Sequence, residues 1–204
     1  MLNEGLLMGK VVVFNGPPSS GKDSLAEYLR GATLVQAMEF KRHLIEIALM
    51  LSGVARDDWE WWYQSDKEKP RPELSGHSCR SFLIMVSEDM VKPNMGRDYF
   101  GRAAVRYLKE NEVGLDSCGF CFTDSGFAEE LQCVVAHVGA ENVIVIQLHR
   151  QGTSFEGDSR DYLDRNAFPD VMFLQHQNDQ PIEESAAALL SVLKAVVADN
   201  RANA

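Results

Sequence analysis

The stretch Gly16-Pro17-Pro18-Ser19-Ser20-Gly21-Lys22-Asp23-Ser24 decides how the rest of the chain is interpreted. It satisfies GxxxxGK, directly follows the β-branched run KVVVF at 10–14, and opens a segment at 23–30 with a helical pattern. Backbone N–H groups of such a loop surround a polyphosphate, the helix dipole favours the negative charge, and the lysine reaches the terminal phosphates. The sequence therefore predicts a phosphate-binding loop of the Walker A type, whose nucleotide-binding residues are Gly16, Pro17, Pro18, Ser19, Ser20, Gly21, Lys22, Asp23 and Ser24.

One position of this loop departs from the common pattern, since Asp23 stands where a serine or threonine usually contacts Mg²⁺. A carboxylate holds hydrated Mg²⁺ directly or through water, and Ser24 is the next residue. The alternative is that Asp23 only caps the positive end of the helix. We favour the metal-linked interpretation and expect ATP and Mg²⁺ as cofactors, with Asp23 and Ser24 as the metal-binding residues.

Apolar runs alternate with amphipathic stretches along the rest of the chain. After the first strand, strand candidates lie at 33–35, 119–123, 143–148 and 171–174, and helical patterns at 40–51, 81–90 (broken at Pro93), 99–109, from about 126, and 182–198. Residues 55–75 read as a helical or mobile insert outside the core, and the polar stretch 150–168 as a lid-like segment. The alternation predicts one domain over 1–204 with a three-layer α/β fold, a parallel sheet of about five strands with helices on both faces, and a small lid.

Composition limits the classes of protein that this chain can belong to. The 204 residues carry 20 Lys and Arg against 30 Asp and Glu, a net charge of −10. No apolar run approaches the roughly 18 residues of a membrane span, and residues 1–10 lack a secretion signal, so we expect a cytoplasmic protein without a membrane partner. The acidic balance also disfavours a broad, non-specific nucleic-acid-binding face.

The cysteines raise the question of a zinc site. Cys118 and Cys121 form a CxxC pair, and Cys133 and His137 follow at helical spacing. The pair lies in an expected strand, where residues three apart point to opposite faces of the sheet. We therefore favour small apolar core thiols over metal ligands.

A phosphate loop alone leaves kinases, GTPases and ATPases open. The chain has no NKxD segment for reading guanine, and no long apolar run ending in Asp-Glu, which favours a kinase with a small acceptor. Asp124 ends the apolar run CGFCF and is expected at the carboxyl edge of the sheet, where doubly wound folds bind ligands. There it would order Mg²⁺-bound water or accept the proton of an acceptor hydroxyl. The alternative is that Asp124 caps the helix that begins near Gly126.

Several charged side chains are candidates for the remaining catalytic and binding tasks. Arg150 and Arg160, in the lid-like segment, would neutralise the transferring phosphoryl group, with a solvated basic pair as the alternative. Arg80, Glu88 and Arg102 lie in the helical middle segment, where an acceptor site would be built, although each has a surface charge as its alternative.

A cluster of aromatic residues lies in the insert. Trp59, Trp61, Trp62 and Tyr63 would stack on a base or an unpaired strand, or would pack a helical insert onto the core, which we favour.

Four stretches together resemble bacteriophage-encoded P-loop kinases. They are GPPSSGKDS at 16–24, SFLIMVSEDMVKPNMGRDYFGRA at 81–103, TDSGFAEE at 123–130 and GDSR at 157–160. The resemblance covers most of the chain and includes the phage deoxynucleoside monophosphate kinases, which are thymidylate-kinase-like, and the related phage kinases that phosphorylate 5-hydroxymethyluracil within DNA. GKD followed by Ser or Thr is shared among them, which makes Asp23 a family feature.

The resemblance implies transfer of the γ-phosphate of ATP to a deoxypyrimidine-type acceptor, in the cytoplasm of a host cell. The acceptor would be the hydroxymethyl group of 5-hydroxymethyluracil in DNA, or alternatively the 5′-phosphate of a free deoxynucleotide, which wants several arginines. We lean to modified DNA, bound locally by Lys67, Lys69, Arg71 and Arg80 beside the tryptophans. A nucleotide-binding module without turnover is a second alternative. The sequence leaves the oligomeric state open, a homodimer included.

Overall fold

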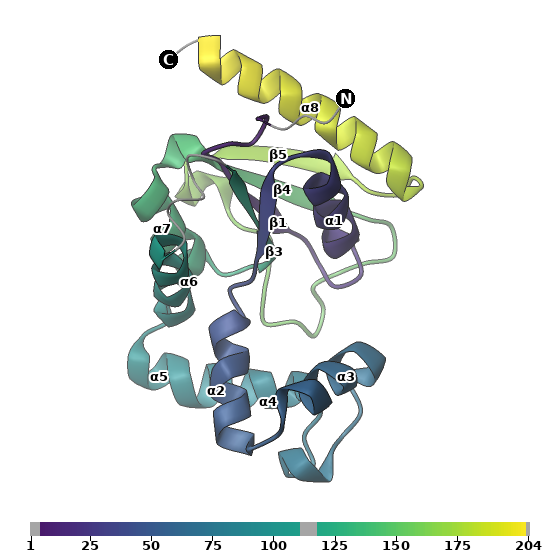
Figure 1. Cartoon of the computed structure of the whole chain (residues 1–204), viewed down its shortest axis with the longest axis vertical. Helices are drawn as coiled ribbons and strands as arrows, with labels where there is room; N and C mark the ends of the chain where they lie inside the picture. The colour runs from purple at the N-terminus through teal and green to yellow at the C-terminus, as the bar shows by residue number, and fades with distance from the viewer. Residues whose placement is uncertain (1–4, 111–117, 203–204) are drawn as a thin grey trace.

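A single parallel sheet forms the centre of the larger part of the molecule. The computed structural model describes residues 5–110 and 118–202. The strands of the sheet follow the order β2-β3-β1-β4-β5, and each neighbouring pair is parallel (Figure 1). Their bounds are Val11–Asn15 (β1), Val35–Met38 (β2), Gly119–Ser125 (β3), Val143–His149 (β4) and Met172–Gln177 (β5). All five predicted strands are confirmed, although β2 begins only at the last residue of its predicted range.

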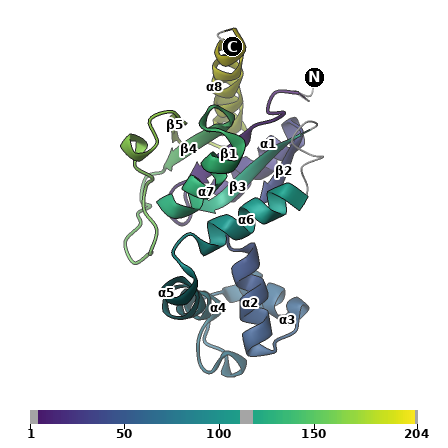
Figure 2. The same ribbon diagram turned by 90° about the vertical axis from the view of Figure 1, so that its left-hand side faces the viewer.

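Helices cover both faces of the sheet. The α1 helix (Lys22–Ala32) and α8 (Ile182–Ala202) cover one face, and α6 (Tyr99–Glu110) and α7 (Ala128–Val138) the other (Figure 2). Within β1, Val12 and Phe14 belong to the cluster with α1 and α8, whereas Val11 and Val13 belong to the cluster with α6 and α7. An uninterrupted β-branched run is thus buried on both sides, as a central parallel strand requires. The predicted three-layer α/β fold is confirmed.

The remaining helices form a lobe beside the sheet, drawn below it in Figure 1. This helical lobe comprises α2 (Arg42–Ser52), α3 (Arg56–Asp66), the 3₁₀ turn η1 (Pro72–Leu74), α4 (Cys79–Ile84), the π-helix η2 (Met85–Val91) and α5 (Lys92–Met95). It has its own buried cluster, which includes Leu44, Trp59, Phe82, Val86 and Phe100.

Two details of the lobe correct the sequence interpretation. The insert at 55–75 does contain a helix, α3, but its Trp59 is 1% exposed and packs edge-on against Phe82, so α3 is a core element of the lobe. The helical stretch also continues past Pro93 to Met95. Because a new α-helical turn begins at Lys92, Pro93 occupies a first turn, where its missing N–H costs no hydrogen bond.

The chain after β4 has little regular structure until β5, apart from the 3₁₀ turn η5 (Arg165–Ala167); another 3₁₀ turn, η4 (Ala140–Asn142), precedes β4. Within the described ranges, no helix combines the length and apolarity that a membrane crossing demands. Cys118 and Cys121 belong to the clusters on opposite faces of the sheet, as their spacing predicted. Over residues 5–110 and 118–202 no group of three or more potential metal ligands is brought together.

Candidate active site

The phosphate loop connects β1 to α1 and has the backbone of an anion-binding turn. Ser19 and Gly21 both adopt positive φ values, 64° and 94°. The α1 helix begins at Lys22, so its positive N-terminal end faces the loop. The predicted strand–loop–helix context is confirmed.

Lys22 is folded back over this loop. Its Nζ donates to the carbonyl oxygens of Gly16 and Pro17 at 2.7 and 2.6 Å, and it is 8% exposed. Burial, followed by the nearby guanidinium of Arg160, lowers the pKa of Lys22 to about 8. A lysine ammonium group that two carbonyls hold in place, and whose pKa is lowered by burial and by a second cation, has a strong electrostatic preference for a polyphosphate.

A chain of hydrogen-bonded side chains from β5, the residue that follows it and α8 supports the phosphate loop. Asn178 Nδ2 donates to the carbonyl of Ser20 at 2.7 Å, and Ser185 Oγ donates to Asn178 Oδ1 at 2.6 Å. His176 Nε2 lies 2.8 Å from the same hydroxyl. A Cβ at Gly21 would overlap the Asn178 amide, so the loop and its support fit only with glycine there.

A second cavity of about 240 Å³ shares Lys22 with the phosphate loop and reaches into the helical lobe. We call it the acceptor pocket. It contains five cationic and five acidic side chains, and Lys41 and Tyr63 come from elements far from the loop in sequence. Its charged lining is Lys22, Lys41, Lys67, Arg80, Arg160, Asp23, Glu88, Asp124, Glu130 and Asp158.

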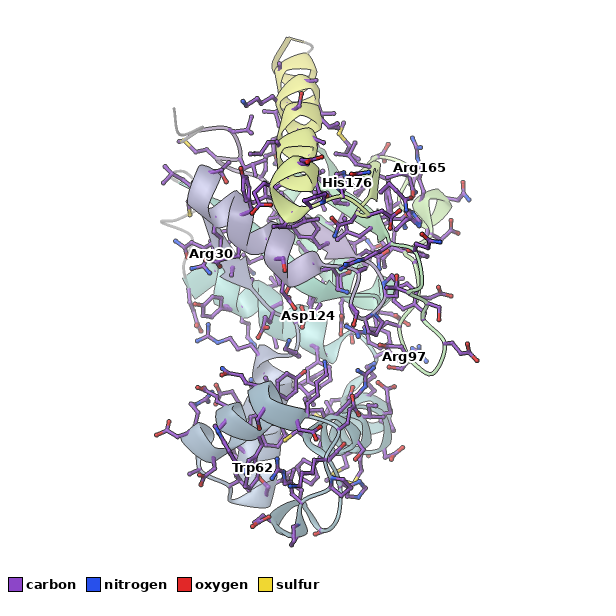
Figure 3. The ribbon with its side chains drawn as sticks, turned by 90° about the vertical axis from the view of Figure 1, so that its right-hand side faces the viewer. Arg30, Trp62, Arg97, Asp124, Arg165 and His176 are labelled. Carbon is purple, nitrogen blue, oxygen red and sulfur yellow. The ribbon has the colours of Figure 1, made fainter. Side chains whose placement is uncertain are left out.

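Asp124 lies at the carboxyl end of β3, between the sheet and the helical lobe (Figure 3). Its two carboxylate oxygens accept hydrogen bonds from the backbone N–H groups of Phe40 and Lys41 at 2.9 and 2.8 Å. It therefore caps the chain entering α2, and not a helix near Gly126. Burial lowers the pKa of Lys41, but Asp124 and further partners outweigh that effect, so the net pKa is raised.

Arg80 and Arg160 meet at one carboxylate. Arg160 binds both oxygens of Asp158, at 2.9 and 2.7 Å, and Arg80 reaches Asp158 Oδ2 at 2.9 Å. Burial raises the pKa of Asp158, but the arginine hydrogen bonds outweigh it and lower the pKa to about 2. This three-residue cluster joins α4 of the helical lobe to the segment after β4. Gly126 is required beside it, since a Cβ there would overlap the Arg160 side chain.

The π-helix supplies another wall of the acceptor pocket. Ser87 and Glu88 both line the cavity from η2, and Lys92 Nζ pairs with Glu88 Oε1 at 2.6 Å. The same ammonium lies 3.5 Å from the ring centre of Phe127. A single-turn π segment is rare in helices and concentrates at functional sites, where its wider turn displaces side chains from regular register.

Other predicted site residues lie elsewhere. Arg150 is exposed, and its Nη1 donates to the Ser19 carbonyl at 3.3 Å. Together with Pro17 it lines a cavity that is separate from the acceptor pocket. Arg102 does not line the acceptor pocket: it pairs with Asp98 on the outer side of α6.

The aromatic cluster of the insert is divided between packing and surface. Trp59 packs in the lobe core, as we favoured, and Trp62 is partly buried against that core (Figure 3). Trp61 is 63% exposed, and Tyr63 lines the acceptor pocket.

Asp23 and Ser24, the two predicted Mg²⁺-binding residues, differ in their position relative to the acceptor pocket. The Asp23 carboxylate lies in the first turn of α1 and lines the acceptor pocket beside Lys22, so it fits a hard cation next to the phosphates. Ser24 is exposed and is not part of that lining. Asp23 is thus the better-placed of the two predicted metal-binding residues.

A larger cavity, about 850 Å³, opens at the β2 edge between α1, α2 and α6. It shares Asp23, Phe40 and Thr123 with the acceptor pocket but does not include Lys22. Its lining includes three arginines, Arg30 among them, and five acidic side chains, so it has no basic character overall. We therefore assign the chemistry to the smaller cavity, which contains the loop lysine.

Four residues of this site escaped the sequence analysis: Lys41, Glu130, Asp158 and Asn178. Asp158 stands two residues before Arg160 in GDSR, and this short separation was a sequence signal that the two side chains could pair. Glu130 lies in the first turn of α7, and acidic residues are so common there that the sequence carries no specific signal. Lys41 and Asn178 become site residues only through tertiary contacts.

Comparisons with known proteins give structural likeness only. No family model and no curated protein sequence matches the chain. Among solved structures, an unliganded sugar kinase from Janibacter sp. HTCC2649 aligns over 89% of this chain and 92% of its own at 11% identity, with a TM-score of 0.47. The protein APE1195 aligns over 94% and 98% at 14% identity, with a TM-score of 0.48. Both scores are below 0.5, so the P-loop kinase-like fold rests on this chain's own strand order and loop geometry.

Proposed function

We propose that this protein is an ATP-dependent phosphotransferase. The observation that carries the proposal is the position of Lys22, which belongs to both the phosphate loop and the acceptor pocket. A γ-phosphate held by the loop would therefore face the acceptor across a single cavity, the proximity that phosphoryl transfer requires. Mg²⁺, held by Asp23, would neutralise charge on the phosphates.

The acceptor that we favour is a deoxypyrimidine, and specifically the hydroxymethyl group of 5-hydroxymethyluracil in phage DNA, as part of DNA hypermodification. Charge in the acceptor pocket supports an uncharged acceptor group, because the acidic side chains of Glu88, Asp124 and Asp158 offset much of the charge of its cationic side chains. Arg80 and Arg160 both bind Asp158 and are thereby partly neutralised. A free deoxynucleoside monophosphate is the alternative acceptor, and Lys41, Lys67 and Arg80 would then bind its phosphate.

Labelled-ATP transfer tests the proposal, with free deoxynucleoside monophosphates and DNA containing 5-hydroxymethyluracil offered in parallel. Label on DNA alone selects the DNA kinase, and label on a monophosphate alone selects the nucleotide kinase. ATP binding without a labelled product on either acceptor would favour a nucleotide-binding module instead. The Lys22→Ala variant serves as the control for loop-dependent transfer.

A further inference from the structure

The buried carboxyl of Glu130 is the most unusual polar group of the acceptor pocket. Glu130 is 4% exposed, and its Oε2 has no hydrogen-bond partner within the described parts of the chain. An unsatisfied buried polar atom costs free energy, commonly about 1–3 kcal/mol, and native proteins contain few of them. A protein that keeps one in a ligand-sized cavity therefore points to a partner that is not part of the chain.

The position of Glu130 is set by close packing of two helices. A Cβ at Gly101 of α6 would lie 2.8 Å from the Glu130 Cα, so only glycine allows α6 and α7 to approach this closely. The approach places Glu130 in the lining of the acceptor pocket, together with Phe127 and Asp124. The close approach of α6 and α7 thus sets the place of Glu130 in the pocket.

The charged groups around Glu130 leave it without an ion-pair partner of its own. Asp124 faces it from β3, Arg160 from the segment after β4, and Lys92 from α5. Lys92 already pairs with Glu88, and Arg160 with Asp158. Glu129 and Cys133 are the remaining titratable groups near it, on its own helix. Burial, then the Asp124 carboxylate, raises the pKa of Glu130, which favours the neutral form of its carboxyl group.

A neutral carboxyl presents one O–H donor and one carbonyl acceptor. That pair is complementary to a hydroxyl group or to the adjacent N–H and C=O of a pyrimidine base. A phosphate group is a poor partner for Glu130 itself, since the neighbouring Asp124 carboxylate repels it.

We infer that Glu130 is a specificity-determining residue that binds the adjacent N–H and C=O groups of the acceptor's pyrimidine base in the acceptor pocket. The inference rests on the proposed function and deepens it, because it names the part of the acceptor that Glu130 binds.

The test measures binding separately from transfer by titration calorimetry, and its probe is 5-hydroxymethyl-2′-deoxyuridine 5′-monophosphate, offered both free and within a short single-stranded oligonucleotide. We expect Glu130→Met to weaken binding of the probe about tenfold, the loss of one or two buried hydrogen bonds, and Glu130→Gln to stay within about threefold. ATP affinity should be unchanged in both. Glu129→Met is the matched control, since Glu129 pairs with Arg97 at 2.7 Å outside the pocket and should not alter binding.

Thermal melting distinguishes a binding role from a structural one. Glu130→Met removes an unsatisfied buried carboxyl, so its melting temperature should equal or exceed that of the wild type while its affinity falls. Unchanged probe affinity in Glu130→Met would overturn the inference while leaving the kinase proposal intact. Glu130-dependent binding without any transfer would overturn the kinase proposal alone, and no probe binding to the wild-type chain would contradict the inference and the acceptor class together.

Discussion

The phosphate loop and the acceptor pocket adjoin each other, yet they are held together in different ways. The loop is shaped by nine consecutive residues at 16–24, by its backbone conformation and by the start of α1. The pocket is built from side chains that come from seven or more separate elements and bind one another, as in the Arg80–Asp158–Arg160 cluster. The loop can therefore be recognised from a short sequence motif, and no other residue replaces one that is lost from it. The pocket cannot be recognised from a motif, and when one of its side chains is lost the remaining contacts share the effect.

The largest expected effect is at the residue that the two sites share. Lys22→Ala removes the ammonium that reaches the phosphates, so we expect kcat/KM for transfer to fall by roughly 10²–10³-fold. The fold should persist, because the Ala side chain suits the first position of α1. Steady-state kinetics with labelled ATP measures the change, and full activity of a correctly folded variant would reject Lys22 as a catalytic residue.

The next effect separates backbone geometry from steric fit in the loop. Gly21→Ala combines a positive φ of 94° with overlap of the Asn178 amide, whereas Gly152→Ala meets a φ of 77° in open space. We expect Gly21→Ala to weaken ATP binding more than about tenfold, because the Asn178 support of Ser20 must move. Gly152→Ala should cost only the backbone strain, about 1 kcal/mol of stability, and little ATP affinity.

Equal loss of ATP affinity in the two glycine variants would contradict a specific role of the Asn178 contact in the phosphate loop. Calorimetric ATP titration of both variants makes the comparison directly.

The same contrast explains what the sequence could predict. The order of strands and helices and the entire phosphate loop were predicted, because β-branched runs, helical spacing and GxxxxGK are local patterns. Asp124 was correctly expected at the sheet edge, but its partners, the N–H groups of Phe40 and Lys41, lie more than 80 positions away. No local rule supplies such a pairing.

Arg102 is a predicted acceptor-binding residue that lies outside the acceptor pocket. It lies in a stretch that carries the family resemblance, yet its side chain faces away from the acceptor pocket, because α6 turns only one face toward the cavity. The π-helix at 85–91 was also beyond prediction, since its sequence fits an ordinary α-helix.

Asp158→Asn tests the side-chain network of the acceptor pocket. The variant keeps one acceptor oxygen but removes the charge that Arg80 and Arg160 share, so we expect acceptor kcat/KM to fall about tenfold and ATP affinity to fall less. Acceptor kinetics equal to those of the wild type would mean that the cluster is dispensable for the pocket.

Stability against pH provides an independent measure of the same cluster. The pKa of Asp158 is lowered in the folded state, so its stabilising contribution is present above pH 4 and is lost as pH falls toward 2. We expect a contribution of about 1–2 kcal/mol after allowance for solvent screening, and Asp158→Asn should lack that part of the acid transition. Urea unfolding at pH 6 and pH 3 measures the difference, and identical pH dependence in both chains would refute the charged cluster.

The smallest effect contrasts two arginines that the sequence treated alike. Arg80→Gln removes a pocket cation that contacts Asp158, and because Arg160 still holds that carboxylate, we expect the acceptor KM to rise only about threefold to fivefold. Arg102→Gln breaks a surface pair with Asp98 outside the pocket and should leave KM and kcat within about 1.5-fold of the wild type. A larger effect at Arg102 than at Arg80 would mean that the acceptor approaches over the outer face of α6. The pocket would then be only the endpoint of a longer binding surface, which a DNA substrate would need more than a free nucleotide would.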